Sequence, residues 1–210
     1  MSDDPGLFEV MYNCRAMRRL EKREVPDDLL LKLIDAANQA PSGSNLQNAA
    51  WIVVKDAGVR QQLADLNRAG VTAYLGGERR RVDGLPHQSA KKRERMLDAV
   101  EWQMDHMHEI PALVVACMEF GMPVNDMTYG HGGGSVWPGI QNLLLAARAL
   151  GLGAAPTTLA LGNRAAVADV LGLPETMAAY CLIPLGYPSG NFGPVKRKPV
   201  SEVMRFDRWQ

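Results

Sequence analysis

Arginine, serine, asparagine and glutamine side chains gather in segments of the sequence that suit a planar, phosphorylated ligand. The segments are the arginine turn at 14–18, the loop at 40–47 and the basic stretch at 196–198. An arginine guanidinium is planar and can donate two parallel hydrogen bonds to one phosphate. Serine, asparagine and glutamine supply the donors and acceptors that suit the polar edge of such a ligand. Together the three segments predict an anionic cofactor.

Other patterns that carry chemistry are incomplete in this chain. The stretch Gly151-Leu-Gly153-Ala-Ala-Pro156 looks like a dinucleotide-binding loop, but it follows a predicted helix instead of a strand, and proline replaces its third glycine. No P-loop motif is present. Ser42 and Ser135 lie near glycines without the Gly-x-Ser-x-Gly pattern of a hydrolase nucleophile. A Rossmann site and a hydrolase are therefore disfavoured.

A cluster of potential metal ligands occurs near the middle of the chain. Asp105, His106, His108 and Glu109 lie within five positions of one another in a segment with helical spacing. Alternate residues on a helix diverge by about 200° around its axis, so these side chains cannot converge on one ion. We expect a surface cluster here and no metal site. No histidine or carboxylate pair stands out as a catalytic acid and base.

Composition and charge limit the partners and the compartment. The chain has 210 residues, with 23 basic and 23 acidic side chains, so the overall balance favours neither nucleic acid nor an anionic membrane as a partner. Three widely spaced cysteines form no disulfide framework and suit a reducing cytoplasm. The first residues are acidic, and no apolar run approaches about 18 residues, so we expect neither export nor a membrane span.

Hydrophobic periodicity predicts an α+β protein with few strands. Apolar residues at helical spacing predict helices within 7–19, 27–37, 59–69, 96–109, 138–150 and 163–171. Short apolar, β-branched runs predict buried strands at 51–54, 110–117 and 179–185. The basic stretch 76–95 predicts an exposed excursion, which is either a solvated surface or a segment with a role in binding.

Several residues predict where these elements begin and end. Asp27 could cap the helix at 27–37, and Pro41 ends it. The glycine-rich segment 130–134 predicts a loop before a central helix that has Pro138 in its first turn. Gly151 could supply the left-handed turn that ends this helix.

Four motifs in order resemble those of the nitroreductase family, flavin enzymes related to iodotyrosine deiodinase, from about residue 8 to 204. Cys14-Arg-Ala-Met-Arg18 resembles the family's Arg-Arg-Ser-x-Arg element, and Ala40-Pro-Ser-Gly-Ser-Asn-Leu-Gln47 resembles its Ala-Pro-Ser-x-x-Asn-x-Gln loop. Gln141–Gly153 is similar to the family's central helix, with Pro156-Thr-Thr-Leu159 after it. Gly186-Tyr-Pro with Lys196-Arg197-Lys198-Pro199 resembles the C-terminal element.

This resemblance implies a fold, a cofactor and a set of site residues. The fold would be nitroreductase-like, with a central, mostly antiparallel sheet flanked by helices, in an intertwined homodimer that holds FMN at the subunit interface. The implied FMN-binding residues are Cys14, Arg15, Ala16, Met17, Arg18, Ser42, Asn45, Gln47, Pro156, Thr157, Thr158, Leu159 and Arg197. Arg15, Arg18 and Arg197 would bind the phosphate and ribityl side.

The other implied residues would lie along the flavin. Ser42, Asn45 and Gln47 would approach it from the partner subunit, while Thr157 and Thr158 would lie beside its N5 edge, where a hydrogen bond stabilises the reduced ring. Cys14 and Ala16 stand where the family often has arginine and serine, so we expect fewer side-chain contacts to the phosphate in this turn.

The implied activity is a ping-pong transfer of electrons from NADH or NADPH, through FMN, to a nitroaromatic, a quinone or another small unsaturated acceptor. One alternative is reductive dehalogenation of a halophenol, although the substrate-clamping Glu, Tyr and Lys of the deiodinases are not located in this sequence. Another is a flavin-binding protein without turnover. We expect one domain over 1–210, in which about 74–108 forms a variable, lid-like excursion that could attract an anionic acceptor.

Overall fold

The chain folds around a four-stranded sheet whose neighbouring strands are all antiparallel. The computed structural model describes residues 5–80 and 88–209. The strand order is β1-β2-β4-β3. The strands are β1 (Ala49–Val54), β2 (Ala112–Glu119), β3 (Gly153–Ala154) and β4 (Met177–Gly186). The α+β class and the three longer strands are thereby confirmed, while the two-residue β3 was not predicted.

Both faces of the sheet are buried, which is why its central strands read as unbroken apolar runs. On β2, Val114 and Ala116 pack into one core, and Leu113 and Val115 pack into the core on the opposite face. This alternation follows from the two-residue period of an extended strand. All of β2 except its last residue is buried, so this strand forms the centre of the molecule.

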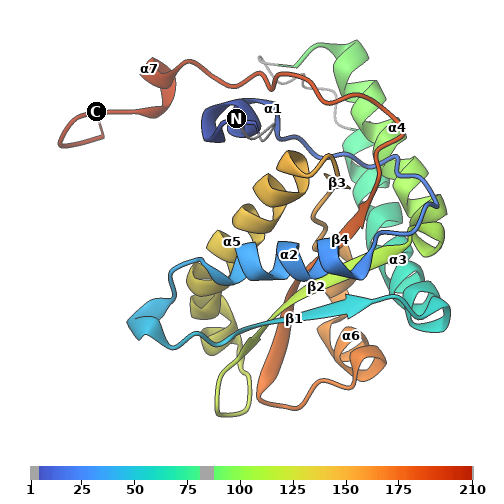
Figure 1. Cartoon of the computed structure of the whole chain (residues 1–210), viewed down its shortest axis with the longest axis vertical. Coiled ribbons are helices and arrows are strands. Elements are labelled where there is room, and N and C mark those ends of the chain that lie inside the picture. The colour runs from blue at the N-terminus through green and yellow to red at the C-terminus, as the bar shows by residue number, and fades with distance from the viewer. Residues whose placement is uncertain (1–4, 81–87, 210) are drawn as a thin grey trace.

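Helices cover the two faces of the sheet in separate layers (Figure 1). One face packs against α2 (Asp27–Asn38) and α5 (Asp126–Ala149). The other packs against α3 (Ala57–Arg80) and α6 (Arg164–Leu171). A helix α4 (Ala90–His106) packs on the outer side of α3 through a third apolar cluster. Short helical segments η1 (Gly43–Asn45), η2 (Met107–Glu109) and η3 (Leu159–Asn163) connect these elements.

The predicted loop at 130–134 is wrong, because these glycines lie inside α5. Asn125 and Thr128 form a reciprocal capping box that starts the helix early, and the helix continues through Pro138. Gly132 is required by packing, since a Cβ atom there would lie 2.3 Å from the Tyr180 hydroxyl oxygen. Tyr180 is the extra residue of a β-bulge in β4, and its ring stacks on Tyr129 of α5. The close approach of sheet and helix therefore explains Gly132, whereas a Cβ atom on Gly130 or Gly134 would meet nothing within 4 Å.

Other element boundaries also differ from the prediction. Helix α1 (Leu7–Asn13) ends before the arginines, which therefore lie in extended chain. Helix α2 begins at Asp27 without a side-chain cap, and the Asp27 carboxylate instead pairs with Lys55 at 2.8 Å. Gly151 has the predicted left-handed conformation, with a φ of 73°.

The expected excursion at 76–95 is largely helical where the structure describes it. Helix α3 continues to Arg80, and α4 begins after Ser89, whose side chain accepts a hydrogen bond from the Lys92 amide. Leu75 and Leu97 help to join the two helices. The remainder of this stretch, 81–87, lies outside the described residues.

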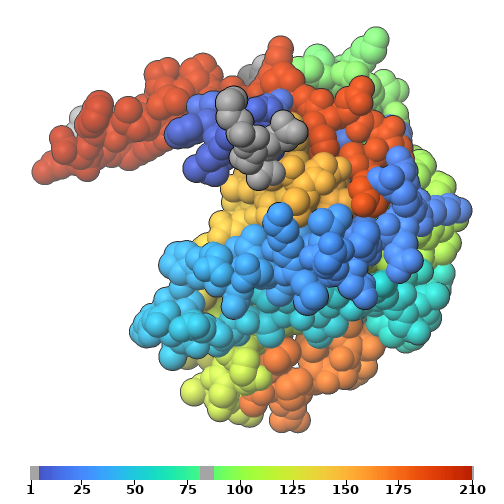
Figure 2. All heavy atoms as spheres, viewed as in Figure 1, coloured from blue at the N-terminus to red at the C-terminus, as the bar shows by residue number. Residues whose placement is uncertain are grey.

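The C-terminal segment extends away from the body of the molecule (Figure 2). It contains the short helix α7 (Val200–Val203), and its apolar side chains are exposed. Phe206 is 82% exposed and Trp209 is 74% exposed. Within the described residues, no helix combines the length and the apolar character that a membrane span requires.

Candidate anion-binding site

A cavity of about 390 Å³ lies between the arginine turn, the C-terminal half of α5 and the segment that follows β4. Its lining includes five of the predicted cofactor residues, namely Cys14, Arg15, Ala16, Pro156 and Arg197. Arg148 of α5 adds a third guanidinium. None of the described residues that line the cavity carries a carboxylate. An excess of positive charge in a partly enclosed hollow favours an anionic ligand.

The arginine turn is fixed to the edge of the sheet by Met17 and by Leu20, which follows the turn. The Met17 amide donates to the Ala154 carbonyl of β3 at 3.0 Å, and Leu20 bridges to Pro188 after β4. Met17 and Leu20 are buried, so their side chains anchor the turn. Gly153 allows this contact, since a Cβ atom there would lie 2.9 Å from the Met17 Cβ. Met17 therefore has a structural role in the turn.

The two predicted arginines of this turn have different surroundings. Arg15 is exposed, lines the cavity and donates from Nη2 to the Asn191 carbonyl at 2.8 Å. Arg18 is half-buried and does not line this cavity. Burial lowers the pKa of the Arg18 guanidinium, and nearby Tyr74 on α3 acts in the opposite direction. No hydrogen bond or ion pair to the Arg18 side chain occurs over 5–80 and 88–209, so its charge is available to a ligand.

The loop at 40–47 lies apart from the arginine turn of the same chain, and none of its residues lines the cavity. Its shape is held internally, because the Ser42 hydroxyl accepts from the Gln47 amide and the Gln47 side chain donates to Asn45 Oδ1. Asn45 and Gln47 have positive φ values of 54° and 51°, as does Ser44 at 51°. Non-glycine residues rarely adopt a positive φ, so three of them in one loop indicate backbone strain, which is typical of binding loops.

In the segment 156–159, some side chains make contacts within the fold and others face the cavity or solvent. The Thr157 hydroxyl donates to Asn67 Oδ1 at 3.0 Å, and its amide donates to the Leu182 carbonyl at 2.8 Å. Leu159 packs in the apolar cluster of α3 and α4. Pro156 lines the cavity, whereas Thr158 is exposed, with no side-chain hydrogen bond to the described part of the chain. Thr158, two residues after Pro156, therefore has a hydroxyl without a partner in the described part of the chain.

Arg148 and Phe192 were not predicted as site residues, although both line the cavity. The Arg148 guanidinium carbon lies 4.4 Å from the centroid of the Phe192 ring, in a cation–π contact. Gln141, Leu144 and Arg148 of α5 all line the cavity, and their spacing of three and four residues places them on one helix face. That spacing is the signal in the sequence that could have identified Arg148.

The cysteine thiols differ in their environments. Burial raises the pKa of the Cys117 and Cys181 thiols to about 12. Cys14 lines the cavity, and the pKa of its thiol is raised by burial, while the charges of Arg148 and Arg197 lower it. Since the thiolate is the reactive form, all three thiols should react slowly at neutral pH, and Cys14 is the one with access to solvent.

We therefore expect iodoacetamide to modify the native protein once, at Cys14, with a rate that rises with pH as the thiolate forms. Cys117 and Cys181 should react only after unfolding in urea. Intact-mass spectrometry over time, followed by peptide mapping, measures both outcomes. Modification of Cys117 or Cys181 at the rate of Cys14 in the native protein would contradict the burial described above.

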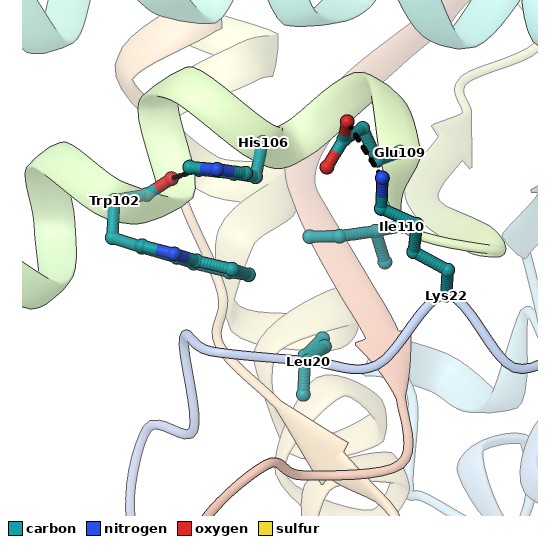
Figure 3. A pocket seen from close by; sticks show the side chains of 6 residues that line it. All are labelled: Leu20, Lys22, Trp102, His106, Glu109 and Ile110. Carbon is teal, nitrogen blue, oxygen red and sulfur yellow. Dashed lines mark hydrogen bonds and ion pairs between the residues drawn. The ribbon is translucent and has the colours of Figure 1, made fainter.

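Two residues of the cluster at 105–109, His106 and Glu109, line a cavity of about 250 Å³ (Figure 3). The His106 ring stacks on Trp102 at 4.3 Å, and its Nδ1 lies 2.8 Å from the Trp102 carbonyl oxygen. Glu109 pairs with Lys22 at 2.9 Å. These contacts agree with the interpretation as a surface cluster. No three histidine, cysteine or carboxylate side chains among the described residues are placed to share a metal ion.

A larger hollow of about 780 Å³ lies between the start of α5, α6 and the start of β4. Asp126, Asp169 and Glu175 line it together with Arg164, which already pairs with Asp126 at 2.6 Å. These carboxylates make the larger hollow less suited to an anion than the cavity between Arg15, Arg148 and Arg197.

Comparison with known proteins identifies relatives over nearly the whole chain. The sequence profile of the Nitroreductase family matches residues 13–187. The iodotyrosine deiodinase of Thermotoga neapolitana is 25% identical over 199 residues, covering 94% of this chain and 95% of that protein. The NADH dehydrogenase of Thermus thermophilus is 28% identical over 206 residues, covering 90% of each chain.

Solved structures share the fold. An iodotyrosine deiodinase bound to FMN and 3-iodo-L-tyrosine superposes with a TM-score of 0.74 at 23% identity, covering 97% of this chain and all of that one. The NADPH:FMN oxidoreductase of Vibrio harveyi in complex with NAD⁺ gives a TM-score of 0.73 at 21% identity, covering 97% of this chain and 78% of that one. The nitroreductase-like fold expected from the motifs is thereby confirmed.

Proposed function

Because the chain belongs to the Nitroreductase family, we propose that it is an FMN-dependent oxidoreductase that passes electrons from NADH or NADPH to a small unsaturated acceptor. The observation that carries this proposal is the cavity that Arg15, Arg148 and Arg197 line without a carboxylate among its described lining residues. Such a site fits a phosphate group. The flavin ring would then lie along the wall that Pro156 forms, beside the exposed Thr158.

Different side chains of this chain would bind the phosphate and the ring of the cofactor. Arg15 and Arg197 would bind the FMN phosphate, and the half-buried charge of Arg18 would face the cofactor from the side of Tyr74. Thr158 would donate a hydrogen bond at the N5 edge, since the Thr157 hydroxyl already donates to Asn67. Bound FMN supplies the acceptance and donation of hydride. The nicotinamide and the acceptor would use the same face in turn, which is a ping-pong order.

The active unit would be an intertwined homodimer. The loop at 40–47 lies outside the cavity of its own chain, so Ser42, Asn45 and Gln47 would reach the flavin of a second copy. The extended C-terminal segment, with Phe206 and Trp209 exposed, would bury its apolar side chains on that copy. The ends of α3 and α4 within 74–108 would cover the substrate. The protein would act in the cytoplasm, because its three free thiols suit a reducing compartment.

Two reaction classes are compatible with this site, and they differ in the compound that accepts the electrons. We favour a nitroaromatic or quinone, and the second candidate is reductive dehalogenation, which the likeness to named iodotyrosine deiodinases supports. The test is steady-state oxidation of NADH and of NADPH by FMN-loaded protein with a nitroaromatic, a quinone or a halophenol, together with measurement of released halide. Rapid nicotinamide oxidation with the first two and no halide supports the proposal. Halide release in proportion to reductant supports the dehalogenase.

A flavin-binding protein without turnover is the remaining candidate. It would hold FMN but oxidise neither nicotinamide faster than free FMN does with any of these acceptors. That outcome would contradict the proposed activity while leaving the binding site in place.

A further inference from the structure

Arg148 is a cation in the cavity whose interactions within the chain are incomplete. It lies in the last turn of α5, and its Nε atom is buried without a hydrogen-bond partner. The described chain provides it with an aromatic ring, Phe192, but no carboxylate. A buried polar N–H without a partner costs about 1–3 kcal/mol, so such a group usually meets a ligand or an ordered water.

The position of Arg148 coincides with a missing charge in the arginine turn. Cys14, where the related motif has arginine, lines the same cavity, and the charge of Arg148 acts on the Cys14 thiol. The Cys14 Sγ atom also lies 3.6 Å from the carbonyl oxygen of Leu144, one helical turn before Arg148. A guanidinium from α5 is thus present beside the position at which the turn lacks one.

Resting on the proposed function, we infer that Arg148 replaces this missing arginine and makes the site selective for a phosphorylated flavin over an unphosphorylated one. Phe192 acts as a positioning residue, because its ring lies under the guanidinium and keeps it at the cavity wall. Arg148 would then donate to the phosphate together with Arg15 and Arg197, and Nε or a terminal nitrogen would gain the acceptor that it lacks.

The test compares the affinities of the purified protein for FMN and for riboflavin, which lacks the phosphate, by quenching of flavin fluorescence. Arg148→Gln should weaken FMN binding by about tenfold to 100-fold, the loss of one charge-assisted hydrogen bond, and leave riboflavin binding unchanged. Phe192→Leu should weaken FMN binding to a smaller extent. The matched control is Arg164→Gln, since Arg164 also lies over an aromatic ring, Tyr129 at 4.2 Å, but outside this cavity.

A rescue variant guards against a general loss of structure. Adding Cys14→Arg to Arg148→Gln should restore FMN affinity at least tenfold, because it returns a guanidinium to the turn. Equal losses for FMN and riboflavin, or unchanged FMN affinity in Arg148→Gln, would overturn the inference while the proposed function stands. A parent protein that binds neither flavin would instead contradict the proposed function itself.

Discussion

Replacing Arg15 and Arg197 together by glutamine is expected to lower the affinity for FMN by about 100-fold to 10,000-fold, since each charged hydrogen bond contributes about 1.5–3 kcal/mol. Both guanidinium groups line the cavity, although they come from opposite ends of the chain. Glutamine keeps hydrogen-bonding groups but removes the charge, so most of the lost FMN affinity should come from weaker binding of the phosphate. Affinity for riboflavin should change little.

Fluorescence titration of the double variant and of each single variant measures this effect. Arg15 also donates to the Asn191 carbonyl, so thermal unfolding of the same proteins is needed to show that the fold is intact. The assignment of the phosphate subsite would be contradicted by a double variant that retains the FMN affinity of the parent. It would also be contradicted if FMN and riboflavin lost affinity in equal measure.

Gly70→Ala is expected to lower the free energy of unfolding by about 3 kcal/mol, the upper end of the usual cost of overpacking. A Cβ atom on Gly70 would lie 2.2 Å from the carbonyl oxygen of Leu159, which is backbone and cannot rotate away. The shift would also disturb the hydrogen bond between Thr157 and Asn67, so the segment beside the cavity should move.

Urea denaturation measures the stability, and the same helix offers a matched control. Gly77 is exposed on α3, and a Cβ atom added there would meet nothing within 4 Å, so Gly77→Ala should stabilise the helix by about 0.5–1 kcal/mol. Thr157→Val removes the hydrogen bond to Asn67, together with the one that the Leu159 amide donates to the same hydroxyl at 3.3 Å, without crowding, and should cost about 1–2 kcal/mol. Equal stability of Gly70→Ala and Gly77→Ala would show that α3 and 157–159 are less tightly packed than described.

The sequence was informative wherever local pattern and burial agree. The β2 and β4 strands are buried on both faces, so their apolar runs identified them directly. The start of α5 could not be predicted, because each glycine in a helix costs about 1 kcal/mol relative to alanine. Only the tertiary contact of Gly132 with Tyr180 and Phe120 favours glycine there. The two residues of β3 are too few to show a period.

Most of the charged residues of the site could be predicted from the sequence, but how the segments come together in space could not. The arginine turn and Arg197 were identified from residue type and motif, and both line one cavity. The family resemblance assigned the loop at 40–47 to the flavin of the partner subunit, but residue pattern alone could not place this loop, since its position depends on the packing of α2 and on the contact of Gly43 with Ser135. Arg148 was missed because a single arginine near a helix C-terminus is usually explained by the helix dipole.

The central claim, that this chain holds FMN and accepts electrons from a nicotinamide, is tested most directly by anaerobic visible spectroscopy. The FMN-loaded protein is mixed with NADH or NADPH, and a nitroaromatic is then added. We predict a bound-flavin spectrum that bleaches with at least one nicotinamide and recovers with the acceptor. A protein that remains colourless after incubation with FMN, or a bound flavin that neither nicotinamide reduces, would contradict the claim.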